Sequence, residues 1–456
     1  MKNILFEALK DIPADYIEVR YEYSEATVIG IHNLDIENSG NSNFCGGIVR
    51  AYLKGAWGVA LFDDISQLKQ HALNAYHNAL LAQRDDEKLE FYAEDIVDFE
   101  HNVEFKNDFR DVPLDEKLAL VFHYNDILQK KTANKETTSV DYVEGMRTVH
   151  FANSLGCYFK EERPRIKCMY SATARKGDLI QRAGDGISSI DDYNKLLNLD
   201  EEVEKIADLT AKLLNAPKCQ GGAQSVILDN KLGGVFIHEA FGHLSEADFL
   251  YDNDKMRELM HLGREVGVKE LNVIDDGSMI GQAGSIIFDD EGTPSSKNYL
   301  IKDGVLSGHL HSRETAAKMG AKPTGNARAV NRSNAPIVRM TNTYIDAGSL
   351  EKRELFSGVE NGVYACDAFG GQTMHEMFTF SAGYGYRIEN GEIAELVRDV
   401  VLTGNVFDTL HNIDGIANDL QIISSPGGCG KGGQSMLPVG FGAPHIRIRN
   451  CVIGGE

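Results

Sequence analysis

Two histidines and a glutamate carry the most visible chemistry in this sequence. His238 and Glu239 are adjacent, and His243 follows five positions after the first histidine. Neutral imidazoles bind transition metals well, and a nearby carboxylate that is not itself a ligand can take the proton from a metal-bound water. The hexapeptide therefore indicates a hydrolytic metal site. Two unrelated histidines around a turn are the alternative.

The spacing of the two histidines differs from that of the common His-Glu-x-x-His motif. In that motif the imidazoles are four residues apart, about 40° around a helix of 3.6 residues per turn. Five residues correspond to roughly 140° on an ideal helix, so the rings of His238 and His243 should diverge. Either the helix contains a π-type bulge, or it breaks near Gly242, where glycine tolerates unusual dihedral angles. Asp229 or Asn230 can cap the start of this helix.

Composition limits where such a site can work. The chain has 456 residues, of which 42% are hydrophobic, enough for two or three domains. Its net charge of −22 disfavours direct contact with nucleic acid, because phosphates would be repelled. No signal-peptide pattern and no apolar run near the ~20 residues of a membrane helix is present. The seven cysteines are scattered without a CxxC pair, so we expect a cytoplasmic protein that does not contact a membrane.

The pattern of elements divides the chain into three segments and predicts an α+β fold. Residues 1–84 form an N-terminal α+β segment, and residues 85–217 form a central one with an antiparallel meander. Residues 218–456 contain short β runs between glycines around one metal-binding helix, which predicts a β-rich, barrel-like catalytic domain. The finer expectations are strands at 16–23 and 26–31, helices at 4–9, 66–82 (capped by Asp64) and 201–214, a helix opening at Pro113, and a charged linker at 85–110.

Several other stretches extend the pattern around the hexapeptide. They are residues 292–294 (Gly-Thr-Pro), 323–326 (Pro-Thr-Gly-Asn), 339–343 (Arg-Met-Thr-Asn-Thr), 425–434 (Ser-Pro-Gly-Gly-Cys-Gly-Lys-Gly-Gly-Gln) and 438–444 (Pro-Val-Gly-Phe-Gly-Ala-Pro). With these motifs the chain resembles the TldD/PmbA family of metallopeptidases from about Tyr16 to its C-terminus. In that family the TldD-type subunit carries His-Glu-x-x-x-His and a distant cysteine, while the PmbA type lacks the metal ligands. This chain resembles the TldD type.

The resemblance implies that Cys429 is the third metal ligand. Two imidazoles and a thiolate leave a fourth position open for water, as in a catalytic zinc site. Sulfur favours zinc over magnesium or calcium, with iron or manganese as further alternatives. We expect one zinc ion per active subunit, with Glu239 as general base. Taken alone, Cys429 would be read as a small buried hydrophobe.

Residues near the motifs are candidates for supporting roles. Glu246 and Asp248 lie just beyond His243 and can orient a ligand imidazole, or serve as caps or surface groups. Three residues are candidates for gripping a peptide carbonyl or a substrate carboxylate, with structural hydrogen bonds as the alternative: Arg339, Asn342 and Lys431. A rival metal pair, His309 and His311, has two-residue spacing that would place both on one face of a strand, but no carboxylate adjoins it.

The leading hypothesis is a zinc metallopeptidase that hydrolyses small or unfolded peptides. The resemblance implies a homodimer, or a heterodimer with a PmbA-type subunit, around an enclosed chamber. An extended peptide could enter this chamber and add to a strand edge, whereas a folded protein could not. The competing hypotheses are a catalytically silent regulatory subunit of a protease complex and a binding protein with a structural metal.

Overall fold

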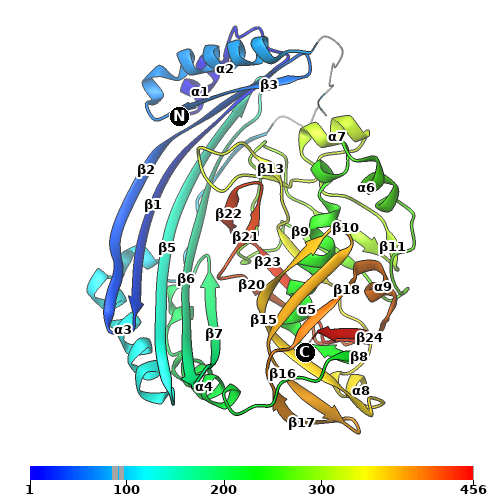
Figure 1. Ribbon diagram of the computed structural model, residues 1–456. Helices are drawn as coiled ribbons and strands as arrows, with labels where there is room; N and C mark the ends of the chain where they lie inside the picture. The colour runs from blue at the N-terminus through cyan, green and yellow to red at the C-terminus, as the bar shows by residue number, and fades with distance from the viewer. Residues whose placement is uncertain (85–90, 92–96, 455–456) are drawn as a thin grey trace.

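A long, curved sheet forms one side of the molecule (Figure 1). In the computed structural model, which describes residues 1–84, 91 and 97–454, its strands run in the order β3-β2-β1-β5-β6-β4, and β7 also pairs with β6. The C-terminal region lies against the concave face of this sheet. The strand bounds are β1 Tyr16–His32, β2 Asp35–Leu53, β3 Ala56–Phe62, β4 Asp98–His101, β5 Lys135–Asn153, β6 Tyr158–Lys176 and β7 Leu179–Ser189.

The first long strand differs from its prediction. The sequence suggested two strands at 16–23 and 26–31, but the structure has the single strand β1. Ser24 and Glu25 do not interrupt it, because both residues pair with β2 on one side and β5 on the other. In a strand that is paired on both sides, the neighbouring strands provide hydrogen-bond partners for the backbone N–H and C=O groups of such polar positions. Local polarity is therefore a poor guide to where this strand ends.

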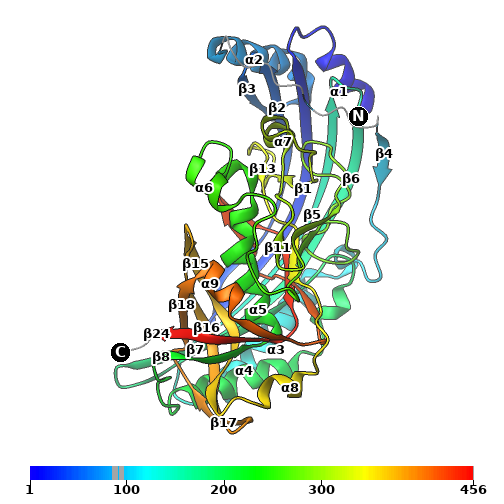
Figure 2. The ribbon, with the colours of Figure 1, turned by 90° about the vertical axis from the view of Figure 1, so that its right-hand side faces the viewer.

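Helices cover the two ends of the long sheet (Figures 1 and 2). At one end lie α1 (Lys2–Leu9) and α2 (Leu68–Ala82), and at the other α3 (Leu114–Lys131) and α4 (Asp200–Leu213). Asp64 accepts a hydrogen bond from the Ser66 backbone at the start of the second helical region, as predicted. Part of the predicted linker, residues 85–90 and 92–96, lies outside the described residues.

A closed barrel of five strands organises the C-terminal region. Each strand pairs with the next in the circuit β15-β8-β24-β18-β16, and β16 pairs back to β15. The α+β class and the barrel-like C-terminal sheet are therefore confirmed. The bounds are β8 Gly222–Leu228, β15 Asn361–Met374, β16 Met377–Glu389, β17 Glu392–Val397, β18 Val401–Asn405, β19 Ile413–Ile416 and β24 Ile446–Gly454.

The helix that leads into the hexapeptide, α5 (Asn230–Ile237), lies between this barrel and a second sheet. It packs against β15 on one side and β23 on the other. A Cβ added at Gly234 would lie 2.8 Å from the backbone nitrogen of Gly442 in β23, so the glycine permits this close approach. The second sheet runs β11 (Val305–Leu306), β10 (Lys297–Lys302), β9 (Val273–Asp276), β14 (Asn342–Ile345), β23 (Gly440–Ala443), β20 (Gln421–Ser424).

Short elements complete the C-terminal region. They are α6 (Asp254–Leu259), α7 (Arg313–Met319), α8 (Lys352–Phe356), α9 (Val406–His411), and the strand pairs β12 (Ala327–Arg328) with β13 (Ile337–Val338) and β21 (Cys429–Lys431) with β22 (Gln434–Leu437). Among the described helices, none combines the length and the apolar character needed to cross a bilayer.

Candidate metal centre

A π-type turn presents the two histidines of the hexapeptide. Asp229 caps α5 by accepting a hydrogen bond from the backbone of Leu232, and the helix then continues into a π-helical stretch, His238–Gly242. The backbone N–H of His243 donates to the carbonyl of His238, a bond that spans five residues. This extra residue per turn brings positions five apart onto one face, so the bulge, one of the two predicted alternatives, is present.

Gly242 serves the turn for a different reason from the predicted one. Its backbone is right-handed helical (φ −56°, ψ −49°), so no unusual dihedral angle requires a glycine. A Cβ at this position would instead lie 2.1 Å from the sulfur of buried Met340. The glycine therefore makes room for core packing behind the two histidines.

Cys429 completes a cluster with the histidines. One ligand atom from each of His238, His243 and Cys429 lies within 4.8 Å of the others, and the Cys429 sulfur is 3.5 Å from Nε2 of His243. The buried Nδ1 of His238 has no hydrogen-bond partner among the described residues. Two imidazoles and a thiol at this separation match the donor set of a zinc ion, so the residues fit the metal that the sequence predicts.

The electrostatics of the cluster favour a cation. Burial alone would raise the pKa of the Cys429 thiol, but the neighbouring imidazoles outweigh burial and lower it to about 4. Burial would likewise lower the pKa of His243, but Glu246 and Cys429 raise it well above its usual value. The thiol is therefore a thiolate at neutral pH, which is the form that binds metals. A bound metal would displace the protons that the imidazoles otherwise hold.

A buried carboxylate fixes the ring of His243. Glu246 is fully buried, and its Oε2 lies 2.9 Å from Nδ1 of His243 and 3.0 Å from Nζ of Lys431. Such a contact selects the tautomer that leaves Nε2 free, facing Cys429. Burial would raise the pKa of Glu246, but His243 and Lys431 outweigh burial and lower it. Glu246 is therefore charged and holds the imidazole in one orientation.

Glu239 points away from this support and toward a cleft. Its carboxylate is 3.6 Å from Nε2 of His243 and its side chain is 31% exposed. The cleft has a volume of about 480 Å³ and also receives His238. Its walls come from β6 and β7 of the long sheet, from β15, and from residues 425–428. One histidine of the cluster, His238, and the carboxylate of Glu239 thus line a cleft that is open to a ligand.

Comparison with known proteins places this arrangement in a family. Three family models match, described as PmbA/TldA metallopeptidase domain 1 at residues 17–79, central domain at 107–216 and C-terminal domain at 221–455. The chain belongs to the PmbA/TldD metallopeptidase family. This membership confirms the family that the motifs predicted.

Individual relatives of this PmbA/TldD chain are consistent with the family assignment. A metalloprotease of Synechocystis sp. is 44% identical over 97% of the chain and 95% of its own length. A zinc metalloprotease TldD homolog of Saccharolobus solfataricus is 34% identical over 62% of the chain and 63% of its own length. The crystal structure of TldE from Thermococcus kodakarensis, 18% identical, covers 100% of both chains with a TM-score of 0.79, which shows a shared fold.

The residues predicted to grip substrate have structural contacts in this family member. Arg339 and Asn342 are fully buried. Nη1 of Arg339 lies 3.3 Å from the carbonyl of Gln434, and the amide of Asn342 donates to Asp276. Lys431 is 8% exposed and pairs with Glu246 and Asp248. Nδ1 of His243 meets Glu246, and Asp248 contacts Lys431 and the backbone of Val338. Arg339, Asn342 and Lys431 thus all have hydrogen bonds within the fold, while Nε and Nη2 of Arg339 have no partner among the described residues. Their substrate roles stay a prediction.

The rival pair is occupied by other contacts. Nε2 of His309 lies 2.8 Å from the carbonyl of Met260, and Nδ1 of His311 lies 3.3 Å from the hydroxyl of Thr315. Within the described part of the chain, three metal-binding side chains lie together at His238, His243 and Cys429, and neither His309 nor His311 belongs to such a group. His309 and His311 therefore stay outside the proposed site.

Two residues of the long sheet approach the cluster without having been predicted. Arg165 and Lys167 of β6 donate hydrogen bonds to the carbonyls of residues 425–427, just before Cys429. Their signal in the sequence is a basic residue at every second position from Arg163 onward, which puts three cations on one face of a strand. Nothing in the spacing indicates which loop, about 260 residues away, they meet.

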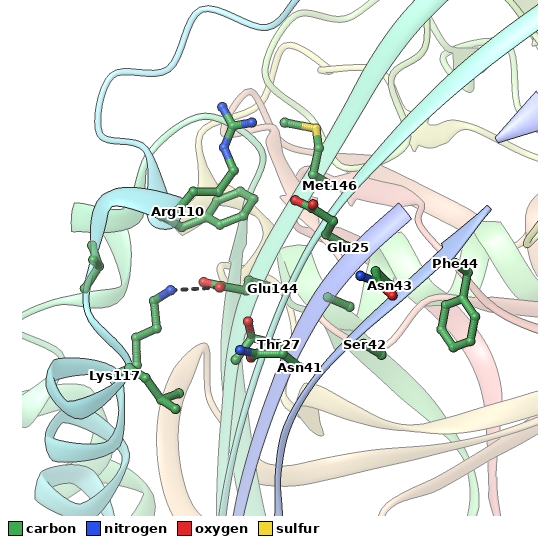
Figure 3. A pocket seen from close by; sticks show the side chains of 14 residues that line it. Glu25, Thr27, Asn41, Ser42, Asn43, Phe44, Arg110, Lys117, Glu144 and Met146 are labelled. Carbon is green, nitrogen blue, oxygen red and sulfur yellow. Dashed lines mark hydrogen bonds and ion pairs between the residues drawn. The ribbon is translucent and has the colours of Figure 1, made fainter. Parts of the chain in front are cut away.

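A second cavity, of about 630 Å³ (Figure 3), shares no lining residue with the cleft at the metal cluster. It is bounded by α3 and by strands β1, β2 and β5, and none of its lining residues belongs to the C-terminal region. Lys117 reaches across it to Glu144 at 2.7 Å, and both side chains are buried. Its buried charges neutralise each other, so no catalytic role is assigned to it.

Proposed function

We propose that this protein is a zinc-dependent peptidase that cleaves small or unfolded peptides. The observation that carries the proposal is the cluster of His238, His243 and Cys429, of which His238 lines a cleft together with Glu239. Three protein ligands leave one position for water, the arrangement of catalytic rather than structural zinc. When bound, the metal supplies a Lewis acid and lowers the pKa of its water. A silent regulatory subunit would not need all four groups.

The chain's own residues then divide the work. The carboxylate of Glu239 accepts a proton from the attacking water and passes this proton to the nitrogen of the leaving amine. Glu246 keeps Nδ1 of His243 occupied, so that Nε2 remains available to the metal. We expect the cleft between the long sheet and the barrel, about 480 Å³ in volume, to admit an extended chain and to exclude a folded domain.

We place the enzyme in the cytoplasm as a homodimer or a heterodimer with a PmbA-type subunit, enclosing the cleft in a chamber. The support is the family membership, together with a TldE structure that has the same fold over the whole chain. The charge of −22 argues against nucleic acid as a substrate.

The test of the function is Glu239→Gln. This change removes the base and spares the ligands, so we expect zinc content to stay at the wild-type level while hydrolysis of an unstructured peptide falls by at least about 100-fold. Elemental analysis and a cleavage assay measure the two quantities. Glu258→Gln, an exposed carboxylate on α6, is the matched control and should change neither. Near wild-type turnover in the Glu239 variant would remove that residue from the mechanism.

A further inference from the structure

The loop that carries Cys429 is bound from outside its own region by two basic side chains of β6. Nη2 of Arg165 lies 3.2 Å from the carbonyls of Ser425 and Pro426 and 3.4 Å from that of Gly427. Nη1 of the same residue lies 3.2 Å from the carbonyl of Met436. Nζ of Lys167 lies 2.8 Å from the carbonyl of Pro426. The contacts thus converge on residues 425–427, which end two positions before Cys429, and on the opposite strand of its hairpin.

Both cations lack the partner that a buried cation usually has. Lys167 is 4% exposed, yet within the described part of the chain neither it nor Arg165 forms an ion pair with a carboxylate. Burial lowers the pKa of Arg165 to about 10, and burial together with Arg165 lowers that of Lys167 to about 8. A buried charge is unfavourable unless hydrogen bonds compensate for it. Here the compensation comes from the carbonyls of the Cys429 loop.

Backbone contacts hold part of the loop: the N–H of Ser425 donates to the carbonyl of Val439, that of Gly428 donates to the hydroxyl of Ser425, and β21 pairs with β22. Glycines occupy positions 427, 428, 430, 432 and 433, and Gly428 adopts φ +109°, which side chains rarely adopt. A glycine-rich segment loses more conformational entropy on ordering than any other kind. After Cys429 the loop is anchored by Lys431, through its ion pairs with Glu246 and Asp248. Before Cys429, the charged side chains that anchor the loop are Arg165 and Lys167 of β6.

We propose that Arg165 and Lys167 are positioning residues for the metal centre, holding the Cys429 loop in place from the long sheet. The proposal rests on the proposed function, because it assumes that Cys429 binds the metal. Neither cation touches the substrate or the metal in this role. The metal affinity of the C-terminal region then depends on its docking to the sheet, since one of the two sets of charged side chains that anchor the loop of the third ligand belongs to the sheet.

The experiment is a titration of the metal-free full-length protein with Co²⁺, followed by absorption spectroscopy. Cobalt reports the metal affinity and, through the charge-transfer band of a thiolate ligand, the engagement of Cys429. For Lys167→Met and Arg165→Met we expect the Kd for Co²⁺ to rise about 10-fold and the thiolate band per bound ion to weaken, an effect typical of lost outer-shell support. Lys167→Arg, which keeps a donor, should recover most of the affinity.

The matched controls are Arg175→Met and Lys176→Met, exposed residues at the end of the same strand. They should leave both the affinity and the band unchanged. If the β6 pair only stabilises the fold, Lys167→Met will lower the unfolding temperature without changing the Kd or the band, and the proposal is overturned. Should Arg165→Met fail to fold, Lys167→Met decides alone. A wild-type protein that binds no Co²⁺ overturns the proposed function and this inference together, whereas tight binding by wild type and variants alike overturns only the inference.

Discussion

Two pairs of histidines, buried except for the half-buried His243, lie in the C-terminal region and are held in different ways. The rings of His238 and His243 are 5.4 Å apart between centroids, and those of His309 and His311 are 6.2 Å apart. The first pair is presented by a π-type turn. The second lies on an extended segment that forms an isolated β-bridge between Leu310 and Glu246. Separation alone therefore does not distinguish a candidate metal site from a packing arrangement.

The two pairs differ in the chemical groups that surround their rings. The first pair has a thiolate, a buried carboxylate on Nδ1 of His243, and an Nδ1 of His238 without a partner. The second pair has a backbone carbonyl and a hydroxyl. Burial lowers the pKa of His309 and His311, whereas acidic neighbours raise the pKa of the first pair despite burial. One environment favours a positive charge and the other excludes it.

The largest expected effect on zinc affinity comes from removing a histidine of the first pair, and a second variant that lacks a histidine of the other pair is the comparison. We expect His238→Ala to lower zinc affinity by more than the roughly 100-fold that outer-shell changes produce, because a ligand itself is lost. We expect His309→Ala to leave zinc affinity unchanged and to lower only the stability of the fold. Competition with a chromogenic chelator measures the affinity of both variants. Equal losses in the two variants would erase the distinction between the pairs.

The fold was predictable where the pattern is local. The helix from Pro113 and the cap at Asp64 follow from short-range preferences, and both are present. The length of β1 did not follow from them, because a strand paired on both sides tolerates polar residues that look like a break. Closure of the barrel depends on pairing β15 with both β8 and β16, which residue patterns indicate only as a tendency.

The site was predictable in its donors and less so in its support. The spacing of His238 and His243 required either a bulge or a break, and the bulge is what the structure has. The place of Lys431 could not be read from its neighbours, since its partner Glu246 lies 185 positions earlier. A lysine in a glycine-rich loop looks available to a ligand, but burial commits this one to two carboxylates.

A smaller effect is expected from the third member of the cluster. In Cys429→Ser a hydroxyl remains near both imidazoles, but it is a harder and poorer zinc ligand than a thiolate, so we expect a loss of affinity on the order of 100-fold. The matched control is Cys451→Ser, because Cys451 is equally buried but its thiol is kept neutral, with a pKa of about 12 raised by burial. Dialysis against a mild chelator followed by metal analysis separates the two. Stoichiometric zinc in the Cys429 variant would show that this residue is not a ligand.

The smallest expected effect concerns acid stability and uses the rival pair. His311 is 5% exposed, and burial, with a further contribution from His309, lowers its pKa to about 4. In the unfolded chain the same group takes up a proton near pH 6.5. Between these two values the unfolded state binds more protons than the folded one, so His311 makes the fold less stable as pH falls.

That difference gives the prediction a sign and a size. Linkage from the two pKa values amounts to a loss of about 2 kcal/mol between pH 7 and pH 5. His311→Gln cannot take up this proton, so the free energy of unfolding of the variant should fall less steeply with acid over that range, and urea unfolding at pH 7, 6 and 5 measures the slopes. In metal-free protein His243→Gln should change the slope in the opposite direction, because the raised pKa of His243 contributes stability that is present at low pH and is lost as pH rises. If both substitutions changed the slope in the same direction relative to wild type, the two pairs would have the same electrostatic surroundings, and the contrast between a candidate metal site and a packed pair would then rest on Cys429 alone.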